Sequence, residues 1–111
     1  MNFVEKQAAI CRRHGAEFLV SPGHLKAGVA RNLGLVPLHG LRHPATEDTT
    51  GWYIWSGEFS EAPDFFEPVH VGHLMEICRD VVPYLGLAPG WRFLVAPGHV
   101  DVWFDKTLLD V

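Results

Sequence analysis

Apolar residues recur at helical spacing in two segments of the chain. The apolar face of the first segment, residues 3–14, consists of Phe3, Val4, Ala8 and Cys11. Gly15 follows this segment as a helix stop. The second segment, residues 69–82, follows Pro68, which suits a first helical position, and Pro83 ends or kinks it. Its buried stripe consists of Val71, Leu74, Met75, Cys78, Val81, Val82 and Leu85. The pattern predicts two principal helices, at about 3–14 and 69–82.

Shorter runs rich in strand-forming residues lie between and after these helices. They predict strands over residues 17–21, 25–30, 51–59, 91–96 and 100–104. Residues 32–50 and 60–68 hold Pro, Gly and acidic residues and are predicted to be loops. A loop as long as 32–50 is uncommon in a compact domain, so it is a candidate binding segment. The order of elements predicts one α+β domain over residues 1–111, with a mainly antiparallel sheet.

One sequence pattern occurs twice. Residues 18–24 read FLVSPGH and residues 93–99 read FLVAPGH. The FLV triplets are predicted to be buried strand, and Pro-Gly fits the two central positions of a type II turn. Because that turn does not match the twist of a two-residue hairpin, we expect each copy to lead into a wider corner. We interpret the repeat as a feature of the fold.

Composition narrows the class of protein. Nine basic and 13 acidic residues give a net charge of -4, and no basic stripe is present, which argues against a nucleic-acid partner. The sequence has no apolar run long enough for a membrane span or a signal peptide. Cys11 and Cys78 are too few for a disulfide scaffold and are predicted to be buried free thiols. These features predict a cytoplasmic protein.

The seven histidines raise the question of a metal site. His70 and His73 are three residues apart on the second predicted helix, which places them on one flank. His24 and His99 are the natural further ligands, but each follows a Pro-Gly turn, where a polar surface residue is expected. The chain has no HExxH or CxxC motif. Histidines at the surface are the simpler interpretation, so no metal or cofactor is predicted.

Other catalytic arrangements find little support. The sequence has no GxSxG, GxGxxG or P-loop motif. Carboxylate pairs could be formed from Glu58 and Asp64, or from Asp101 and Asp105. The second pair alternates with apolar residues as on an ordinary half-buried strand. We therefore predict a protein that is not an enzyme.

Aromatic and acidic residues are concentrated in the middle of the chain. The aromatic residues Trp52, Trp55, Phe59, Phe65 and Phe66 alternate there with Glu58, Glu61, Asp64 and Glu67. On the predicted strand, Trp52 and Ile54 face one way and Tyr53 and Trp55 face the other. One of these faces packs on helices, and the other is either covered as well or presents an aromatic–acidic patch. Aromatic anchors surrounded by charge are typical of protein interfaces.

The same region carries a family resemblance. Residues 48–58, DTTGWYIWSGE, resemble the D-S-G-W segment of a bacterial immunity-protein family, immunity protein family thirty-three. The following loop SEAPDFFEPVHVGHL, the segment YLGLAPGWRFLVA and the terminal VDVWFDKTLL are similar to that family in the same order. The resemblance covers about residues 20–109. The chain departs from the family in having Val29-Ala-Arg-Asn32 before the long loop and Asp-Thr-Thr before Gly-Trp.

The resemblance implies a small α+β protein that neutralises a cognate toxin of a bacterial polymorphic-toxin system. Immunity proteins act by stoichiometric binding, so the resemblance brings no catalytic residue and no cofactor. Aromatic anchors and carboxylates would match a cationic toxin surface. The candidate partner-binding residues are Glu47, Asp48, Trp55, Glu58, Asp64, Phe65 and Phe66.

Two other functions remain open from the sequence. One is a small metal-binding module or metal-dependent enzyme that uses His70 and His73. The other is a structural or regulatory interaction module. A homodimer through an exposed edge strand is also compatible with a short sheet, because edge strands must be paired or protected.

Overall fold

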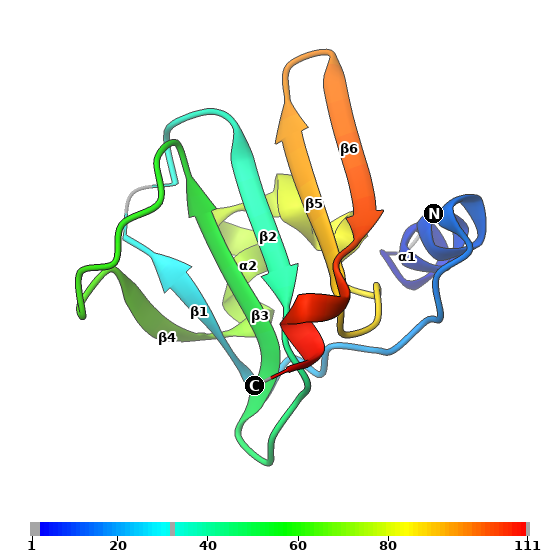
Figure 1. Cartoon of the computed structure of the whole chain (residues 1–111), viewed down its shortest axis with the longest axis horizontal. Coiled ribbons are helices and arrows are strands. Elements are labelled where there is room, and N and C mark those ends of the chain that lie inside the picture. Colours follow the sequence, from blue (N-terminus) through cyan, green and yellow to red (C-terminus); the bar gives the residue numbers. More distant parts are fainter. Residues whose placement is uncertain (1–2, 32, 111) are drawn as a thin grey trace.

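The computed structural model describes residues 3–31 and 33–110, which form a six-stranded mixed sheet flanked by helices (Figure 1). The strands are β1 (Lys26–Ala30), β2 (Leu38–Arg42), β3 (Thr49–Ser56), β4 (Phe66–His70), β5 (Trp91–Ala96) and β6 (His99–Phe104). Their order across the sheet is β4-β1-β3-β2-β5-β6. β1 and β3 are parallel, and the other neighbouring pairs are antiparallel. The structure thus confirms the predicted α+β class.

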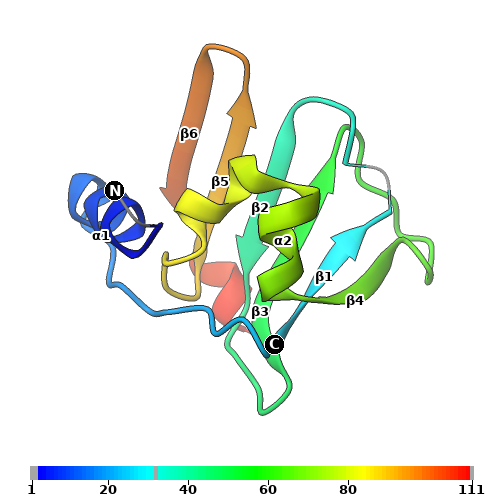
Figure 2. The same cartoon turned by 180° about the vertical axis from the view of Figure 1, so that it is seen from behind.

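The helical elements lie on both faces and at one side of the sheet. They are the α-helices α1 (Phe3–His14) and α2 (Val71–Ile77) and the 3-10 helices η1 (Arg79–Tyr84) and η2 (Lys106–Leu109). Figure 2 shows α2 and η1 across the sheet and α1 beside η1. No helix in the described part of the chain has the length and apolar character needed to cross a bilayer.

The other side of the sheet, turned away from α2 and η1, is here named the open face. It faces the viewer in Figure 1, and η2 crosses it near one end. Its strand residues include His39, Leu41, Tyr53, Trp55, Arg92, Leu94 and Trp103. Every one of these residues lies opposite another one across a pair of neighbouring strands. The open face therefore extends without a break from β3 to β6.

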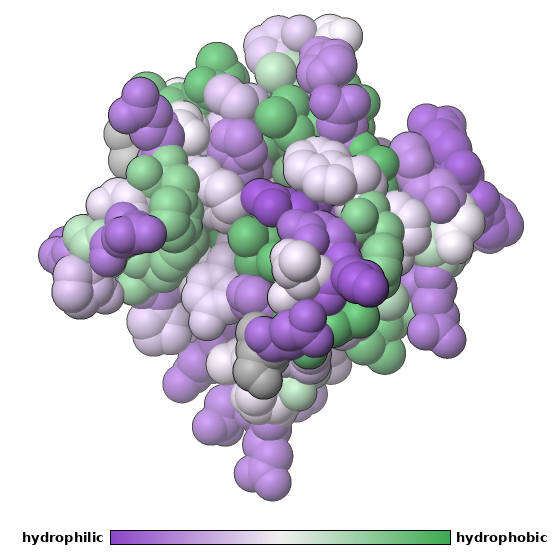
Figure 3. Space-filling view, in the orientation of Figure 1, coloured by the Kyte–Doolittle hydropathy of each residue, from purple (hydrophilic) through white to green (hydrophobic). Residues whose placement is uncertain are grey.

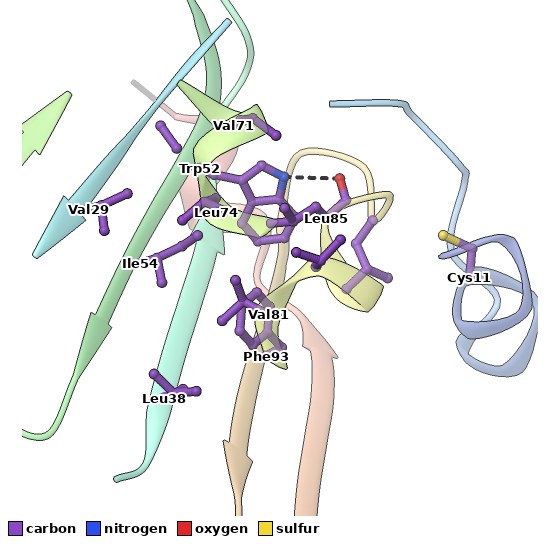
Figure 4. Close-up of a cluster of buried hydrophobic side chains, with 13 residues drawn as sticks. Cys11, Val29, Leu38, Trp52, Ile54, Val71, Leu74, Val81, Leu85 and Phe93 are labelled. Carbon is purple, nitrogen blue, oxygen red and sulfur yellow. Dashed lines mark hydrogen bonds between the residues drawn. The ribbon is translucent and has the colours of Figure 1, made fainter. Parts of the chain in front are cut away.

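The hydrophobic core lies between the sheet and the helices (Figure 4). From β3, Trp52 and Ile54 point into this core, as the predicted alternation requires. The indole of Trp52 packs against Phe93, at 5.5 Å between ring centroids, and its Nε1 donates a 3.2 Å hydrogen bond to the Leu85 carbonyl. Leu74 from α2 completes the contact between the layers. The strand alternation thus decides which aromatic side chains serve the core and which reach the open face.

The first predicted helix is present with the predicted bounds, but its buried face differs. Val4 is exposed, and Gln7 is buried in its place beside Cys11. The Gln7 amide donates a 2.8 Å hydrogen bond to the Val82 carbonyl of η1. A buried amide with a partner is stable inside a protein, so the apolar pattern alone misplaced this face.

The second predicted helix, at 69–82, is wrong in its extent. Pairing of β4 with β1 continues as far as His70, so Pro68 belongs to a strand and α2 begins at Val71. The α-helix ends after Ile77 because Cys78 has a non-helical backbone (φ -156°, ψ 76°). The chain then continues as the 3-10 helix η1, which contains Pro83. The apolar stripe is nevertheless buried in its central part, because both helices lie on the same core.

The predicted strand at 17–21 is absent. The segment forms one isolated bridge, between Phe18 and Leu87, and the side chains of residues 18–20 are exposed. The predicted loop 32–50 contains β2 instead, although LHGLR has few strand-forming residues. Gly40 allows this segment to pair with β5. A Cβ at that position would overlap the ring of Phe93, which lies opposite Gly40 on β5. The predicted loop 60–68 likewise ends in the first residues of β4.

The two FLV-x-PGH segments fold differently. The first forms a corner, in which Leu25 N–H donates to the Pro22 carbonyl and Gly72 N–H donates to the Gly23 carbonyl. The second forms a tight hairpin, because Ala96 and His99 pair directly across the two-residue turn. The expectation of a wider corner is therefore wrong for the second copy. The prediction of buried FLV triplets is wrong for the first copy, and in the second copy only Phe93 is fully buried.

Candidate functional site: the open face and its acidic groove

An aromatic cluster occupies the β3–β4 side of the open face. Tyr53 and Trp55 project from β3 and contact Phe66 at the start of β4, with ring centroids 5.1 Å and 6.1 Å apart. Phe59 and Phe65, from the loop between these strands, complete the cluster. Nearly all of these contacts are edge-on, the arrangement that aromatic quadrupoles favour. The loop is thereby folded down onto the sheet.

The members of the cluster differ in exposure. Phe59 is 55% exposed and Tyr53 is 38% exposed, so both are available at the surface. Trp55 is only 4% exposed, because His39 stacks on it at 4.9 Å and Phe59 and Phe66 cover its other sides. Figure 3, which shows the molecule from the open face, has apolar side chains at the surface beside strongly hydrophilic ones. Trp55 thus forms the floor of the aromatic cluster, and Phe59 and Tyr53 form its exposed part.

A glycine on the neighbouring strand makes room for Tyr53. A Cβ at Gly28 of β1 would lie 2.7 Å from the Tyr53 ring. The ring therefore rests over the β1 backbone, where any larger residue would displace it. A small apolar hollow of about 200 Å³ lies on the β2 side of this ring, lined by Leu41, His43, Tyr53, Phe59 and Phe66. Gly28 therefore has a packing role in this strand.

The open face continues onto β5 and β6 with a charged group. The Arg92 guanidinium lies 5.4 Å from the Trp103 ring centroid and forms a 3.2 Å ion pair with Asp105. Burial, and secondarily the charge of Arg92, lower the pKa of His39. His39 therefore favours its neutral form, which suits its stacking on Trp55.

A groove of about 540 Å³ lies beside the aromatic cluster, where the parallel strands β1 and β3 end. Its lining residues are Ala30, Arg31, Leu35, Ser56, Glu58, Ala62, Asp64 and Phe65. We name this feature the acidic groove because it holds two carboxyl groups, those of Glu58 and Asp64. Its guanidinium, from Arg31, pairs with Glu67 at 3.2 Å. The carboxyl groups thus stand beside apolar walls and an aromatic ring.

The structure divides the candidate residues into two groups. Glu58, Asp64 and Phe65 line the acidic groove, and Trp55 and Phe66 contact Phe65 or its cluster. The other group, Glu47 and Asp48, lies in the turn between β2 and β3. β3 separates the groups by its full length, roughly 25 Å at the usual rise per strand residue. The seven candidates therefore do not form one continuous patch.

Sequence reasoning missed several residues of this region. Arg31 and Leu35 line the acidic groove, yet they are distant in sequence from Glu58 and Asp64. The parallel pairing of β1 with β3 brings these segments together, and no local pattern announces that pairing. Tyr53 lies on the strand face that the alternation predicts, but it is not among the candidate partner-binding residues predicted from the sequence. Its neighbour Gly28 was the available signal, because glycine in a strand can indicate close approach of another group.

The candidate metal ligands are scattered. His70 is the last residue of β4 and His73 belongs to α2, with ring centroids 6.1 Å apart. His24 precedes β1, whereas His99 begins β6, which three strands separate from β1 in the sheet. His99 pairs with Asp101 at 2.9 Å. Within residues 3–31 and 33–110, no group of three or more His, Cys, Asp or Glu side chains is arranged to hold a metal ion.

Both cysteines are free thiols. Cys11 is buried and donates to the Gly86 carbonyl at 3.4 Å, whereas Cys78 is half-buried. Burial raises the pKa of each thiol, which keeps both in the protonated, weakly nucleophilic form. Their environment is that of structural cysteines.

Comparison with known families agrees with this architecture. The Imm33-like domain matches residues 6–105, a span that contains all six strands and the whole acidic groove. The chain therefore belongs to the Imm33-like domain family, as the resemblance of its central segments indicated. No curated protein and no solved structure gives a match.

Proposed function

We propose that the protein is an immunity protein that neutralises a bacterial toxin by binding it in a stoichiometric complex, without catalysis. The observation that carries this proposal is the open face, whose exposed aromatic rings lie beside carboxyl groups that make no ion pair with the described residues, in a chain of the Imm33-like family. This combination is suited to binding a protein surface. Burial raises the pKa of both thiols, which disfavours nucleophilic chemistry at Cys11 and Cys78.

The aromatic cluster supplies the apolar part of the proposed interface. Phe59 and Tyr53 present ring surface to solvent while Trp55 and Phe66 hold them from below. Aromatic side chains that are already fixed in place lose little conformational freedom on binding, which is why such residues concentrate binding energy. Support from beneath makes Phe59 the strongest anchor candidate.

The carboxyl groups supply the electrostatic part. Glu58 and Asp64 border the cluster, and the whole chain carries a net charge of -4. A negative surface accelerates encounter with a positively charged partner and disfavours negatively charged ones. The proposed partner is therefore a toxin with a basic surface.

The proposed contact surface is centred on Glu58, Asp64, Phe65 and Phe66, with Trp55 as its floor. Glu47 and Asp48 lie at the other end of β3, so they contact the same toxin only if it covers the length of that strand. An interface of ordinary size, about 800 Å² on each partner, is large enough for this.

The test uses the protein encoded next to this gene as the partner. We expect the two proteins to form a complex with one-to-one stoichiometry by calorimetry, and co-expression to remove the partner's toxicity. Phe59→Ser should weaken binding by about tenfold or more, because it removes an interface anchor. Val4→Ser is the matched control, since Val4 is also 55% exposed but lies on α1.

Two results would count against the proposal. If the protein encoded by the adjacent gene neither binds this chain nor harms cells when it is expressed alone, the proposed function is wrong. Equal affinities of the wild-type protein and Phe59→Ser would move the interface away from the aromatic cluster.

A further inference from the structure

We infer that the acidic groove is a receptor for one basic side chain, a lysine or an arginine, that projects from the partner protein. The identity of the partner rests on the proposed function, whereas the chemistry of the groove rests on its own residues. Three features of the groove lead to this ligand: its unused carboxyl groups, its apolar and aromatic walls, and the engagement of its own cation.

The two carboxyl groups are unused within the fold. Glu58 and Asp64 make no ion pair or side-chain hydrogen bond with any of the described residues. By contrast, Asp101 is paired with His99, Asp105 with Arg92 and Glu67 with Arg31. Two such carboxylates lining one groove repel anions and attract a cation.

The cation already present does not neutralise them. Arg31 lines the groove, but its Nε lies 3.2 Å from a carboxylate oxygen of Glu67, next to the neighbouring cavity. Counting Glu67, three carboxyl groups stand against one guanidinium. The groove keeps an excess of negative charge that an incoming lysine or arginine would complement.

The walls match the rest of such a side chain. Ala30, Leu35 and Ala62 provide apolar contact for a chain of methylene groups, and long basic side chains bury that part readily. The Phe65 ring can receive the cationic head by cation–π attraction. A groove of about 540 Å³ has ample room for one such side chain. A bare metal ion fits poorly, because the described residues supply no third ligand there.

The test uses capped tripeptides as probes. Acetyl-Gly-Arg-Gly-amide, its lysine analogue and its citrulline analogue would be titrated into the ¹⁵N-labelled protein at low salt and followed by amide chemical shifts. We expect saturable shifts at groove residues with the arginine and lysine peptides. Citrulline has nearly the same shape without the charge, so its affinity should be at least about tenfold lower.

Paired variants assign the effect to the groove. The double variant Glu58→Gln, Asp64→Asn should lower the affinity for the arginine peptide by about tenfold or more, and remove most of its salt dependence. The matched control is Glu47→Gln, Asp48→Asn, which removes the same charges at the other end of β3. All four positions are exposed, so amide spectra of both variants should show an intact fold.

The outcomes separate this inference from the proposed function. Equal binding of the arginine and citrulline peptides, no saturable shift, or unchanged binding by the groove variant would each overturn the inference. A partner that binds the wild type and the groove variant with equal affinity would also overturn it, while the proposed function would stand. If the groove binds the peptides in a charge-dependent way but the protein binds no toxin, the inference about the groove is supported and the proposed function is wrong.

Discussion

The guanidinium of Arg42 donates a 2.8 Å hydrogen bond to the carbonyl oxygen of Leu87 in the interior of the protein. The same side chain also bonds to the nearby Leu85 carbonyl and reaches two further segments, through hydrogen bonds to the carbonyls of Leu19 and Val20 and to that of Thr50. None of the ion pairs among the described residues involves it. Carbonyl dipoles therefore replace a carboxylate counter-ion. Burial lowers its pKa to about 10, which leaves it charged at pH 7.

Replacing Arg42 should severely destabilise the fold. Arg42→Met removes the donors and leaves several buried carbonyl groups without a partner, so we expect a loss of about 3 kcal/mol or more in the free energy of unfolding. Urea denaturation measures this loss. Arg12→Met is the control, because Arg12 is exposed on α1 and should change stability little. Similar midpoints for the two variants would show that the hydrogen bonds of Arg42 contribute little.

The close approach of β5 to β2 depends on a glycine. At Gly40 a Cβ would overlap the Phe93 ring, so Gly40→Ala should force the ring out of its place in the core and destabilise the protein by about 1–3 kcal/mol. Gly23→Ala is the matched control, because a Cβ there meets nothing closer than 3.6 Å and Gly23 is not in the left-handed region. Thermal denaturation should separate the two variants, and equal melting temperatures would contradict the packing argument.

Asp105 makes stability depend on pH below its ordinary pKa of 3.8. The Thr107 hydroxyl, the Thr107 backbone N–H and Arg92 all bind this carboxylate and hold its pKa low. A depressed pKa means that the unfolded chain takes up the proton first, so this stabilisation is present above pH 3.8 and is lost as the pH falls through the folded-state pKa.

The measurement compares melting temperatures of the wild type and Asp105→Asn across this range. We expect the wild type to be the more stable at about pH 6 and the difference to shrink towards about pH 2, where both side chains are neutral. Asp110→Asn is the control, since the Asp110 carboxyl group makes no ion pair or side-chain hydrogen bond with the described residues. A difference that does not change with pH would contradict the assignment.

The two edges of the sheet differ in protection. β4 contains Pro68, which cannot donate to an added strand, whereas β6 has no proline and exposes Val100 and Phe104, each 49% accessible. We expect copies of the chain to associate through β6 at high concentration and Val100→Lys to suppress this association. Sedimentation velocity measures it, with Val4→Lys as the control. A wild-type chain that is monomeric at every concentration would refute this expectation.

The sequence could indicate the elements whose signals are local. α1 has the predicted bounds, and β5 follows the predicted run of strand-forming residues. The alternation along β3 correctly assigned Trp52 to the core and Trp55 to the other face. Each of these depends on a periodicity within a few neighbouring residues, which a helix or strand imposes directly on its own sequence.

Other features were decided only by contacts between distant segments. The pairing of β2 with β5 depends on Gly40, whose missing side chain leaves room for the Phe93 ring. Residues 18–20 lie outside the sheet, where the backbone carbonyls of Leu19 and Val20 accept hydrogen bonds from Arg42. These relationships join residues far apart in sequence, so no local pattern contains them.

The candidate site shows the same division. The sequence by itself determined that aromatic and acidic residues would be dense between residues 47 and 67 and gave the family resemblance. The tertiary structure separated Glu47 from Glu58 by the length of β3 and brought Arg31 and Leu35 to the acidic groove. The physical reason is that composition is a property of the chain, whereas a groove arises where strands paired at long range end side by side.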